Sequence, residues 1–326
     1  MKTKLAMLVV VVSVIVGCTA KYVRPTTEET VEPTPQRLER GRYLVENVAM
    51  CGACHDGRAS GQLLDPATPS LRLAGGHFLE DMGMAIYVPN ITGDVETGLG
   101  GWSDDQIIRS IRDGVRPDGK FLFPMMPFGA YQKMSDEDVR SVVVFLRSVP
   151  KIKTPRPARE NEIPFVVKTA LGMGVAMHEP VKSVPAPDMG DPVKYGEYLA
   201  YMGHCTECHS LGTTGARAKN DRWMGGSDSA MEMKGVGKVW AANLTPSREH
   251  GIGNYSAQQV KDALLSGRRL DGKGMAPPMS LFTPYLTFMK PEDMDALVAY
   301  LHSLPPVEKG VPQRELSPEY QQLLDR

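Results

Sequence analysis

The chain has 326 residues, in which 37 lysines and arginines nearly balance 38 aspartates and glutamates. This length allows two domains of ordinary size, and the near-neutral charge, without a basic block, argues against nucleic-acid binding. Aromatic residues make up only 7% of the chain, while glycine and proline are plentiful. We therefore expect small, loop-rich domains, in which a large prosthetic group could supply the apolar mass that side chains lack.

The N-terminus has the pattern of a targeting segment followed by a tether. Two lysines precede an apolar run at residues 5–16, which is too short to span a bilayer. The run ends in I-V-G-C at Cys18, which resembles a bacterial lipobox. We predict a signal peptide over residues 1–17, export, and membrane anchoring through a lipid on Cys18. An ordinary secretory peptide with an incidental cysteine is the alternative. Residues 18–35 are polar and predict a flexible tether.

A first domain is predicted over residues 36–150, and we expect it to contain three main helices. An amphipathic segment runs into the first cysteine pair, a middle helix opens at Ser103, and a last helix opens at Ser135 and ends before Pro150. Gln106 follows Ser103 at the spacing of a capping box. The sequence contains no alternating strand pattern of any length, so the expected class is all-α.

The same pattern recurs in a second domain, predicted over residues 191–306. A proline-rich connection at residues 151–190 precedes it, and a polar tail at residues 307–326 follows it. Three sequence blocks are repeated at one constant offset, which indicates two copies of one domain. The matched blocks are residues 90–92 and 243–245, 98–103 and 251–256, and 118–120 and 271–273.

Each copy contains the motif C-x-x-C-H, at residues 51–55 and 205–209. Two thiols one helical turn apart can form thioethers with the two vinyl groups of one porphyrin, and the next residue can offer its imidazole to the iron. The motifs therefore predict two covalently bound haem c groups. The attachment and iron-binding residues are Cys51, Cys54 and His55 in the first copy, and Cys205, Cys208 and His209 in the second.

Two other uses of these cysteines fit the sequence less well than haem attachment. One zinc ion held by all four thiols would leave the abutting histidines and the duplication unexplained. A pair of thioredoxin-like dithiols would require a βαβ context, which the sequence does not contain. Haem attachment explains the spacing, the histidines and the repeat together.

The second iron ligand in each copy is predicted to be a methionine selected by the repeat. Met126 and Met279 each lie six residues after the lysine of a repeated D-G-K block, and both follow proline-containing turns. Met134 and Met289 also match, but Met134 directly precedes a helix cap, where an apolar residue packs as a hydrophobic staple. We therefore predict Met126 and Met279 as the axial ligands opposite the motif histidines.

Both copies resemble class I cytochrome c domains, and residues 36–306 resemble the cytochrome c subunits of membrane-bound alcohol and gluconate dehydrogenases. The resemblance rests on G-x-Y-L before each cysteine pair, on C-x-x-C-H, and on the N-(I/L)-T, D-G-K and S-D-E-D sequences. It implies an all-α fold around each haem, His/Met ligation and membrane-associated electron transfer. Those subunits commonly carry three haems and a C-terminal amphipathic anchor, whereas this chain has two motifs and a polar tail.

These features predict an electron carrier rather than an enzyme. It would pass electrons outside the cytoplasm between a membrane-associated dehydrogenase and a respiratory acceptor, and could itself be the electron-transfer subunit of a dehydrogenase complex. The alternative is a di-haem peroxidase-like oxidoreductase, which needs one haem with an open distal position. The equal placement of Met126 and Met279 argues against such an open position.

Overall fold

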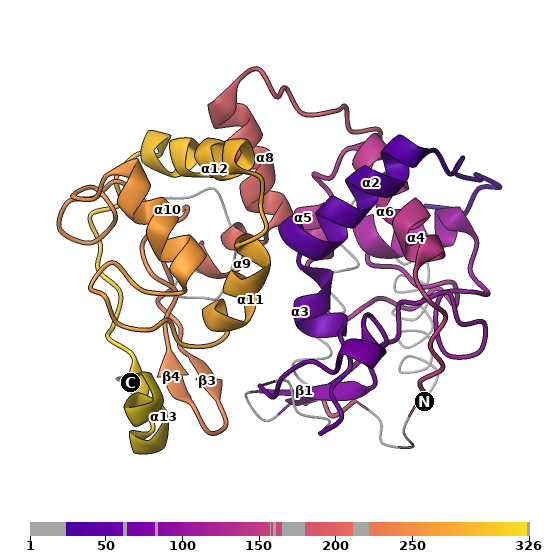
Figure 1. Cartoon of the computed structure of the whole chain (residues 1–326), viewed down its shortest axis with the longest axis horizontal. Coiled ribbons are helices and arrows are strands. Elements are labelled where there is room, and N and C mark those ends of the chain that lie inside the picture. Colours follow the sequence, from indigo (N-terminus) through magenta and orange to yellow (C-terminus); the bar gives the residue numbers. More distant parts are fainter. Residues whose placement is uncertain are drawn as a thin grey trace, which may run out of the picture.

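The computed structural model describes residues 24–60, 64–81, 84–156, 158, 161–164, 180–210 and 222–324. In these parts the chain forms two mainly helical domains side by side, with the first in indigo to magenta and the second in salmon to yellow (Figure 1). Cys18 and the predicted signal peptide lie outside the described residues. Among the helices that are described, none combines the length and the apolar character needed to cross a membrane.

Domain 1 is built from helices joined by long loops, with one hairpin. Strand β1 (His77–Asp81) pairs antiparallel with β2 (Met84–Val88), so that His77 lies opposite Val88. The helices are α2 (Pro35–Tyr43), the π-helical turn η1 (Leu44–Val48), α3 (Cys51–His55), the 3-10 turn η2 (Pro69–Leu71), α4 (Asp104–Arg112), α5 (Phe128–Tyr131) and α6 (Asp136–Ser148).

Domain 2 repeats this order and adds the C-terminal tail. Strands β3 (Met231–Met233), β4 (Gly237–Val239) and β5 (Glu315–Leu316) form one small antiparallel sheet with β4 in the middle. The helices are α8 (Pro192–Met202), α9 (Cys205–His209), α10 (Ala257–Ser266), α11 (Met279–Leu286), α12 (Pro291–Ser303) and α13 (Pro318–Leu324).

The short strands correct the expectation of an all-α chain. The fold is mostly helical, but each domain carries a small sheet next to its motif helix in sequence order. The strands were not predictable from the sequence because they are two to five residues long. Some also mix charged with apolar residues, as in M-E-M of β3 and H-F-L-E-D of β1. Such short pairs give too few residues for a period of two to be recognised.

The predicted helix starts are confirmed by their caps. Ser103 Oγ accepts a hydrogen bond from Gln106 N at 3.2 Å, and the Gln106 side chain accepts one from Ser103 N at 2.9 Å. Ser256 and Gln259 form the same reciprocal capping box at the start of α10. Helix α6 begins after Ser135 and ends at Ser148, as the sequence predicts.

Glycine is required where the first and last helices of each domain cross. A Cβ atom on Gly41 would overlap the backbone carbonyl of Ser141, and one on Gly196 would overlap the carbonyl of Ala296. These contacts bring α2 against α6 and α8 against α12. The glycine of each G-x-Y-L sequence therefore permits the close helix packing that frames each domain.

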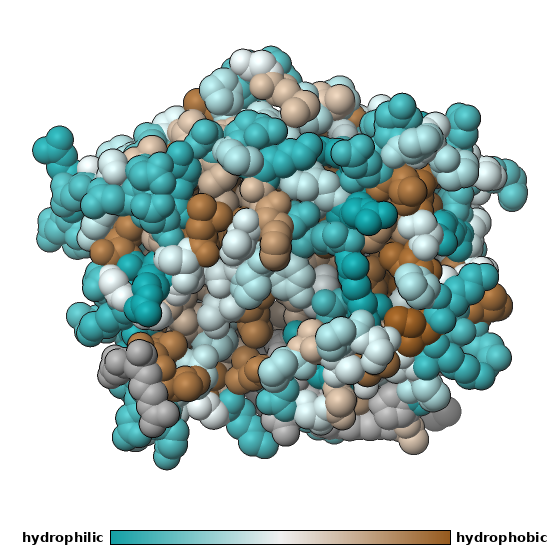
Figure 2. All heavy atoms as spheres, viewed as in Figure 1, coloured by the Kyte–Doolittle hydropathy of each residue, from teal (hydrophilic) through white to brown (hydrophobic). Residues whose placement is uncertain are grey.

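One hydrophobic core runs through both domains. It includes buried residues that lead into both motifs, Leu44 of η1 and Leu199 of α8, and buried residues of both last helices, such as Val143 and Leu297. The molecular face in Figure 2 is mostly hydrophilic, and hydrophobic side chains appear on it as small separate patches. The domains therefore share buried apolar surface rather than folding as two separate globules.

Two tyrosines also join the domains, because each donates a hydrogen bond to the last helix of the other domain. Tyr43 of domain 1 donates to Asp293 of domain 2 at 2.7 Å, and Tyr198 of domain 2 donates to Asp138 of domain 1 at 2.6 Å. The two tyrosines occupy matching positions of the repeat, and so do the two aspartates. The boundary consequently has an approximate two-fold arrangement, which fixes how the two motif helices face each other.

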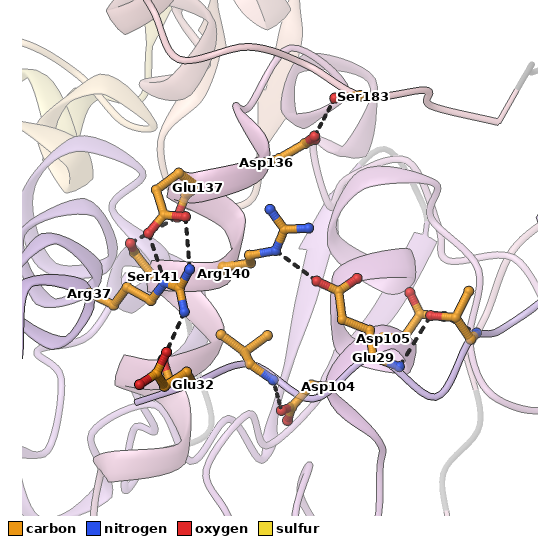
Figure 3. Close-up of polar contacts among 12 residues, drawn as sticks. Glu29, Glu32, Arg37, Asp104, Asp105, Asp136, Glu137, Arg140, Ser141 and Ser183 are labelled. Atoms are coloured by element: carbon orange, nitrogen blue, oxygen red, sulfur yellow. Dashed lines mark hydrogen bonds and ion pairs between the residues drawn. The ribbon is translucent and has the colours of Figure 1, made fainter. Parts of the chain in front are cut away.

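The segment predicted as a flexible tether is held against domain 1 over residues 24–34, which corrects that expectation for this stretch. Arg24 forms an ion pair with Asp105 at 2.8 Å, and Arg140 forms one with Glu29 at 2.7 Å. The backbone N–H of Val31 donates to Asp104 at 2.9 Å. Figure 3 shows Asp104 and Asp105 of α4 and Arg140 of α6 reaching toward this segment, where Arg140 meets Glu29.

Candidate functional site

The two C-x-x-C-H motifs form matching single-turn helices, α3 and α9. The residue before each first cysteine has left-handed backbone geometry, with φ of 49° at Met50 and 48° at His204. Positive φ is uncommon for residues other than glycine, so the same turn is imposed at the entrance of both motifs. The repeat in sequence is therefore also a repeat in backbone conformation at the site.

Each motif histidine is oriented by a backbone carbonyl. His55 Nδ1 lies 2.9 Å from the oxygen of Pro89, and His209 Nδ1 lies 2.7 Å from the oxygen of Ala242. Because a carbonyl can only accept, Nδ1 carries the proton and Nε2 keeps the lone pair for a metal. Burial lowers the pKa of both imidazoles, which favours the neutral form that binds iron.

The repeated N-(I/L)-T block holds these carbonyls in place. Asn90 Oδ1 accepts a hydrogen bond from Thr92 N at 2.8 Å, and its Nδ2 donates to the Ile152 carbonyl at 2.6 Å. Asn243 makes the corresponding bonds in domain 2 at 2.9 and 2.8 Å. Pro89 directly precedes Asn90, so the turn that marks the duplication in sequence is what positions the histidine acceptor.

A pair of glycines closes the other side of each motif helix. Gly75 N donates to the carbonyl of His55 at 2.7 Å, and Gly226 N donates to the carbonyl of His209 at 2.8 Å. The sequence interpretation missed this role, although the Gly-Gly pair recurs in both copies close to the common offset. It also missed the acceptors at Pro89 and Ala242, because a backbone carbonyl has no residue-type signature.

A buried cation lies beside the motif of domain 1. Arg58 donates to the carbonyls of Ala53 at 2.9 Å and Asp56 at 2.7 Å, which caps the C-terminal end of α3. Its guanidinium lies 3.5 Å from His77 Nε2. Burial and then the charge of Arg58 lower the pKa of His77 to about 4, so this histidine is neutral at pH 7.

The cysteines have the properties of attachment residues rather than of reactive dithiols. No disulfide joins Cys51, Cys54, Cys205 or Cys208. Burial raises the pKa of the Cys51 and Cys205 thiols to about 12 and that of Cys54 to about 11. Dithiol oxidoreductases need a thiolate of low pKa, which the burial of Cys51, Cys54 and Cys205 opposes.

The structure places both predicted methionine ligands in the part of each domain that follows the repeated D-G-K turn. Met126 N donates to the carbonyl of Phe123 at 3.0 Å, and Met279 is the first residue of α11. Both side chains are partly buried against the core that also receives Cys51 and Cys205. The neighbouring Met125 is 38% exposed, whereas Met134 and Met289 are buried core residues.

The residues of each site fit a covalently attached haem. Each site offers two partly buried cysteines one helical turn apart and an imidazole whose Nε2 is left for iron by the Nδ1 hydrogen bond. The soft thioether of a partly buried methionine is available in the same domain core. Both sites share this donor set, and the matched backbone contacts orient both in the same way.

Comparison with known protein families matches the two domains separately. Residues 36–146 match the model for subunit III of the cbb3-type cytochrome c oxidases, and residues 193–305 match the cytochrome c model. These limits agree closely with the helical domains. Both halves of the duplicated chain are therefore similar to cytochrome families.

Curated relatives extend the similarity across both domains. The chain is 29% identical to the fructose dehydrogenase cytochrome subunit of Gluconobacter japonicus and 30% identical to the cytochrome c subunit of the quinone alcohol dehydrogenase of Gluconobacter oxydans, over 85% and 84% of its length. It spans only 55% and 56% of those two proteins. It is also 27% identical to a dihaem c-type cytochrome of Cereibacter sphaeroides, with 79% of this chain and 83% of that protein covered.

Proposed function

Because the chain is a two-domain c-type cytochrome that carries two covalently bound haem c groups, we propose that it is an electron-transfer relay. It is an electron carrier and leaves substrate oxidation to a partner. The observation that carries this proposal is the equal treatment of the two sites. His55 and His209 are both held through Nδ1 by a backbone carbonyl, so both imidazoles are oriented for iron in the same way.

The residue roles that we propose follow the motifs. Cys51 and Cys54 hold one haem, and Cys205 and Cys208 hold the other, through thioethers. His55 with Met126 and His209 with Met279 bind the two irons. When bound, each haem supplies a centre that alternates between ferric and ferrous iron and so carries one electron. The protein residues orient the imidazoles, shield the sites with the shared core and tune the potentials through the thioether ligands.

The partner that we propose is a membrane-associated dehydrogenase, from which electrons pass to a respiratory acceptor. The supporting observation is that several relatives are named as cytochrome subunits of fructose, alcohol or gluconate dehydrogenases. We further propose export to the periplasmic side or the cell surface and a lipid anchor on Cys18. The lipobox-like sequence supports the anchor.

Anchoring can be tested on the mature protein. Intact mass should show a chain that begins at Cys18 with added lipid, and Cys18→Ser should leave the membrane fraction with both haems still attached. Cleavage elsewhere without added lipid would contradict the anchor while leaving the relay proposal intact.

The relay is tested by mixing the half-reduced protein with carbon monoxide and with hydrogen peroxide in stopped flow. With both irons six-coordinate, carbon monoxide should bind slowly and peroxide turnover should stay negligible, while the reduced protein passes electrons to a small acceptor protein. A peroxidase would instead bind carbon monoxide rapidly at one site per chain and sustain peroxide turnover. That result would overturn the relay assignment.

A further inference from the structure

A hydrogen bond crosses the domain boundary between the two haem-attachment segments. His204 Nε2 lies 2.9 Å from the carbonyl oxygen of Ala49. His204 directly precedes Cys205, and Ala49 lies two residues before Cys51. The entrances of the two C-x-x-C-H helices therefore touch each other, and the contact is made by a side chain on one side and by backbone on the other.

Tyr131 from α5 of domain 1 completes this contact. Its hydroxyl donates to the Ala49 carbonyl at 3.1 Å and lies 3.0 Å from His204 Nε2. The imidazole stands edge-on between two rings, with centroids 5.8 Å away at Tyr131 and 5.7 Å away at Phe282. In Figure 1 the elements that supply these residues, α5, α9 and α11, meet with α3 at the centre of the molecule. Packing and hydrogen bonding together fix the ring.

The protonation of His204 follows from its surroundings. The Ala49 carbonyl can only accept, so Nε2 carries a proton and donates it to this bond. Burial lowers the pKa of His204 to about 4, which keeps the imidazole neutral at pH 7. The bond is therefore a neutral donor–acceptor contact that persists over the physiological range of pH.

The backbone alone does not call for histidine at this position. The matching residue of the first copy, Met50, has the same left-handed conformation with φ of 49°, beside 48° at His204. Methionine is thus compatible with the turn, and histidine adds a polar contact to the other domain. The two copies therefore differ, Met50 against His204, at the point where the two haem-attachment segments are in contact.

We propose that His204, oriented by Tyr131, is a positioning residue that couples the two haem sites for electron exchange within the chain. From Cys51 the backbone leads to the Ala49 carbonyl, across one hydrogen bond to His204, and on to Cys205. A path of covalent bonds and one hydrogen bond carries electronic coupling better than a gap of the same length. The proposal rests on the relay function, because a relay with two haems needs exchange between them.

The test compares His204→Met with the wild-type protein after rapid one-electron reduction of the fully oxidised form. The optical signals of the two haems report how fast the electron redistributes. His204→Met restores the residue found at the matching position, so the turn is kept and the cross-domain bond is lost. We expect severalfold slower redistribution, a smaller slowing in Tyr131→Phe, and partial recovery in His204→Gln, which retains an N–H donor.

Tyr285→Phe is the matched control. Tyr285 also reaches across the boundary, to Asp56 at 3.3 Å, but it takes no part in the His204 contact. This variant should redistribute electrons at the wild-type rate. Potentiometric titration and intact mass are measured on every variant, and they should show unchanged reduction potentials and two attached haems, because none of these residues is a proposed iron ligand.

The outcomes separate this inference from the relay itself. Slower redistribution in His204→Met at unchanged potentials, with recovery in His204→Gln, supports the coupling role. Redistribution at the wild-type rate in His204→Met overturns it, and so does equal slowing in Tyr285→Phe. The relay proposal falls separately, if the wild-type protein does not pass electrons to an acceptor protein.

Discussion

The two domains place an aspartate at the same position and balance its charge in different ways. Asp138 receives two hydrogen bonds from the Arg40 guanidinium at 2.7 and 2.8 Å and one from Tyr198. Asp293 receives its bonds from two phenols, Tyr43 at 2.7 Å and Tyr195 at 3.3 Å. The duplicated backbone places both aspartates at the same position. Arg40 and Tyr195 also occupy one matched position, so Asp138 is bound by a cation and Asp293 by a neutral phenol.

This difference shows how a duplicated fold can diverge without moving its helices. The tyrosine hydroxyls are also held alike, since Tyr198 accepts from Ser135 N at 3.2 Å and Tyr43 accepts from Lys290 N at 3.1 Å. Two matched positions differ between the copies: Arg40 and Tyr195 meet the acids with different side chains, whereas Ser135 and Lys290 both contribute a backbone N–H. Variants at matched positions therefore show which properties come from the shared backbone fold and which come from the side chain that differs between the copies.

The largest effect is expected from removing the proposed methionine ligands one copy at a time. Met126→Ala and Met279→Ala should each abolish one haem's share of the thioether-to-ferric charge-transfer band. Each should also lower the potential of that haem, because a soft thioether favours ferrous iron. Optical potentiometry on each variant would show whether the two sites respond alike.

Neighbouring methionines provide the control for this pair. Met125→Ala should leave both bands and potentials unchanged, since its side chain is 38% exposed. Met275 has no methionine counterpart in the first copy, so Met275→Ala should also have no effect. Loss of the second haem's band in Met275→Ala would show that the ligand in domain 2 is misassigned.

The next largest effect concerns the two interface aspartates. Asp138→Asn keeps the shape but leaves the largely buried Arg40 guanidinium without its charge partner, which should cost about 3 kcal/mol of unfolding free energy. Asp293→Asn leaves two phenols that can still donate to the amide oxygen, so its cost should be about 1 kcal/mol. Denaturant midpoints of the oxidised proteins measure both. Equal losses would show that the cation at Arg40 makes no difference.

The sequence predicted much of this site because its signals are local. C-x-x-C-H and the capping boxes at Ser103 and Ser256 depend on residues within one or two helical turns, and the caps are confirmed. The contacts that orient the histidines involve backbone carbonyls at Pro89 and Ala242, which any residue can supply. Contacts across the domain boundary join positions far apart in the chain, where no spacing rule applies.

A smaller effect on the unfolding free energy is expected at alkaline pH, because Tyr195 can lose its proton there whereas its counterpart Arg40 stays charged. Burial and Asp293 raise the pKa of Tyr195 to about 12, against the opposing effect of Arg40. An unfolded tyrosine ionises near pH 10, so this stabilisation is present below pH about 10 and is lost as the pH rises to about 12.

Ionisation of Tyr195 should lower the unfolding free energy of the wild-type protein by about 2 kcal/mol over this pH range. Tyr195→Phe should remove that share of the pH dependence. Urea midpoints measured from pH 9 to pH 12 give the comparison. Identical slopes in wild type and Tyr195→Phe would contradict the shifted pKa of Tyr195.

The smallest expected effect compares the chain segments that cover the two domains at their outer ends. Arg24 attaches the N-terminal segment to the Asp105 carboxylate at 2.8 Å, whereas Arg314 attaches the C-terminal segment to the carbonyl of Gly274 at 2.7 Å. Each arginine is partly accessible, so Arg24→Ala and Arg314→Ala should each cost about 1 kcal/mol or less of unfolding free energy.

The costs of these two substitutions should differ in their response to salt. An ion pair is screened by added salt, so the cost of Arg24→Ala should shrink between low and high ionic strength, and by more than the cost of Arg314→Ala, whose Nη1 donates to an uncharged carbonyl. Thermal denaturation at two salt concentrations decides this, and a salt-independent cost for Arg24→Ala would mean that Asp105 holds the N-terminal segment through hydrogen bonding rather than through charge.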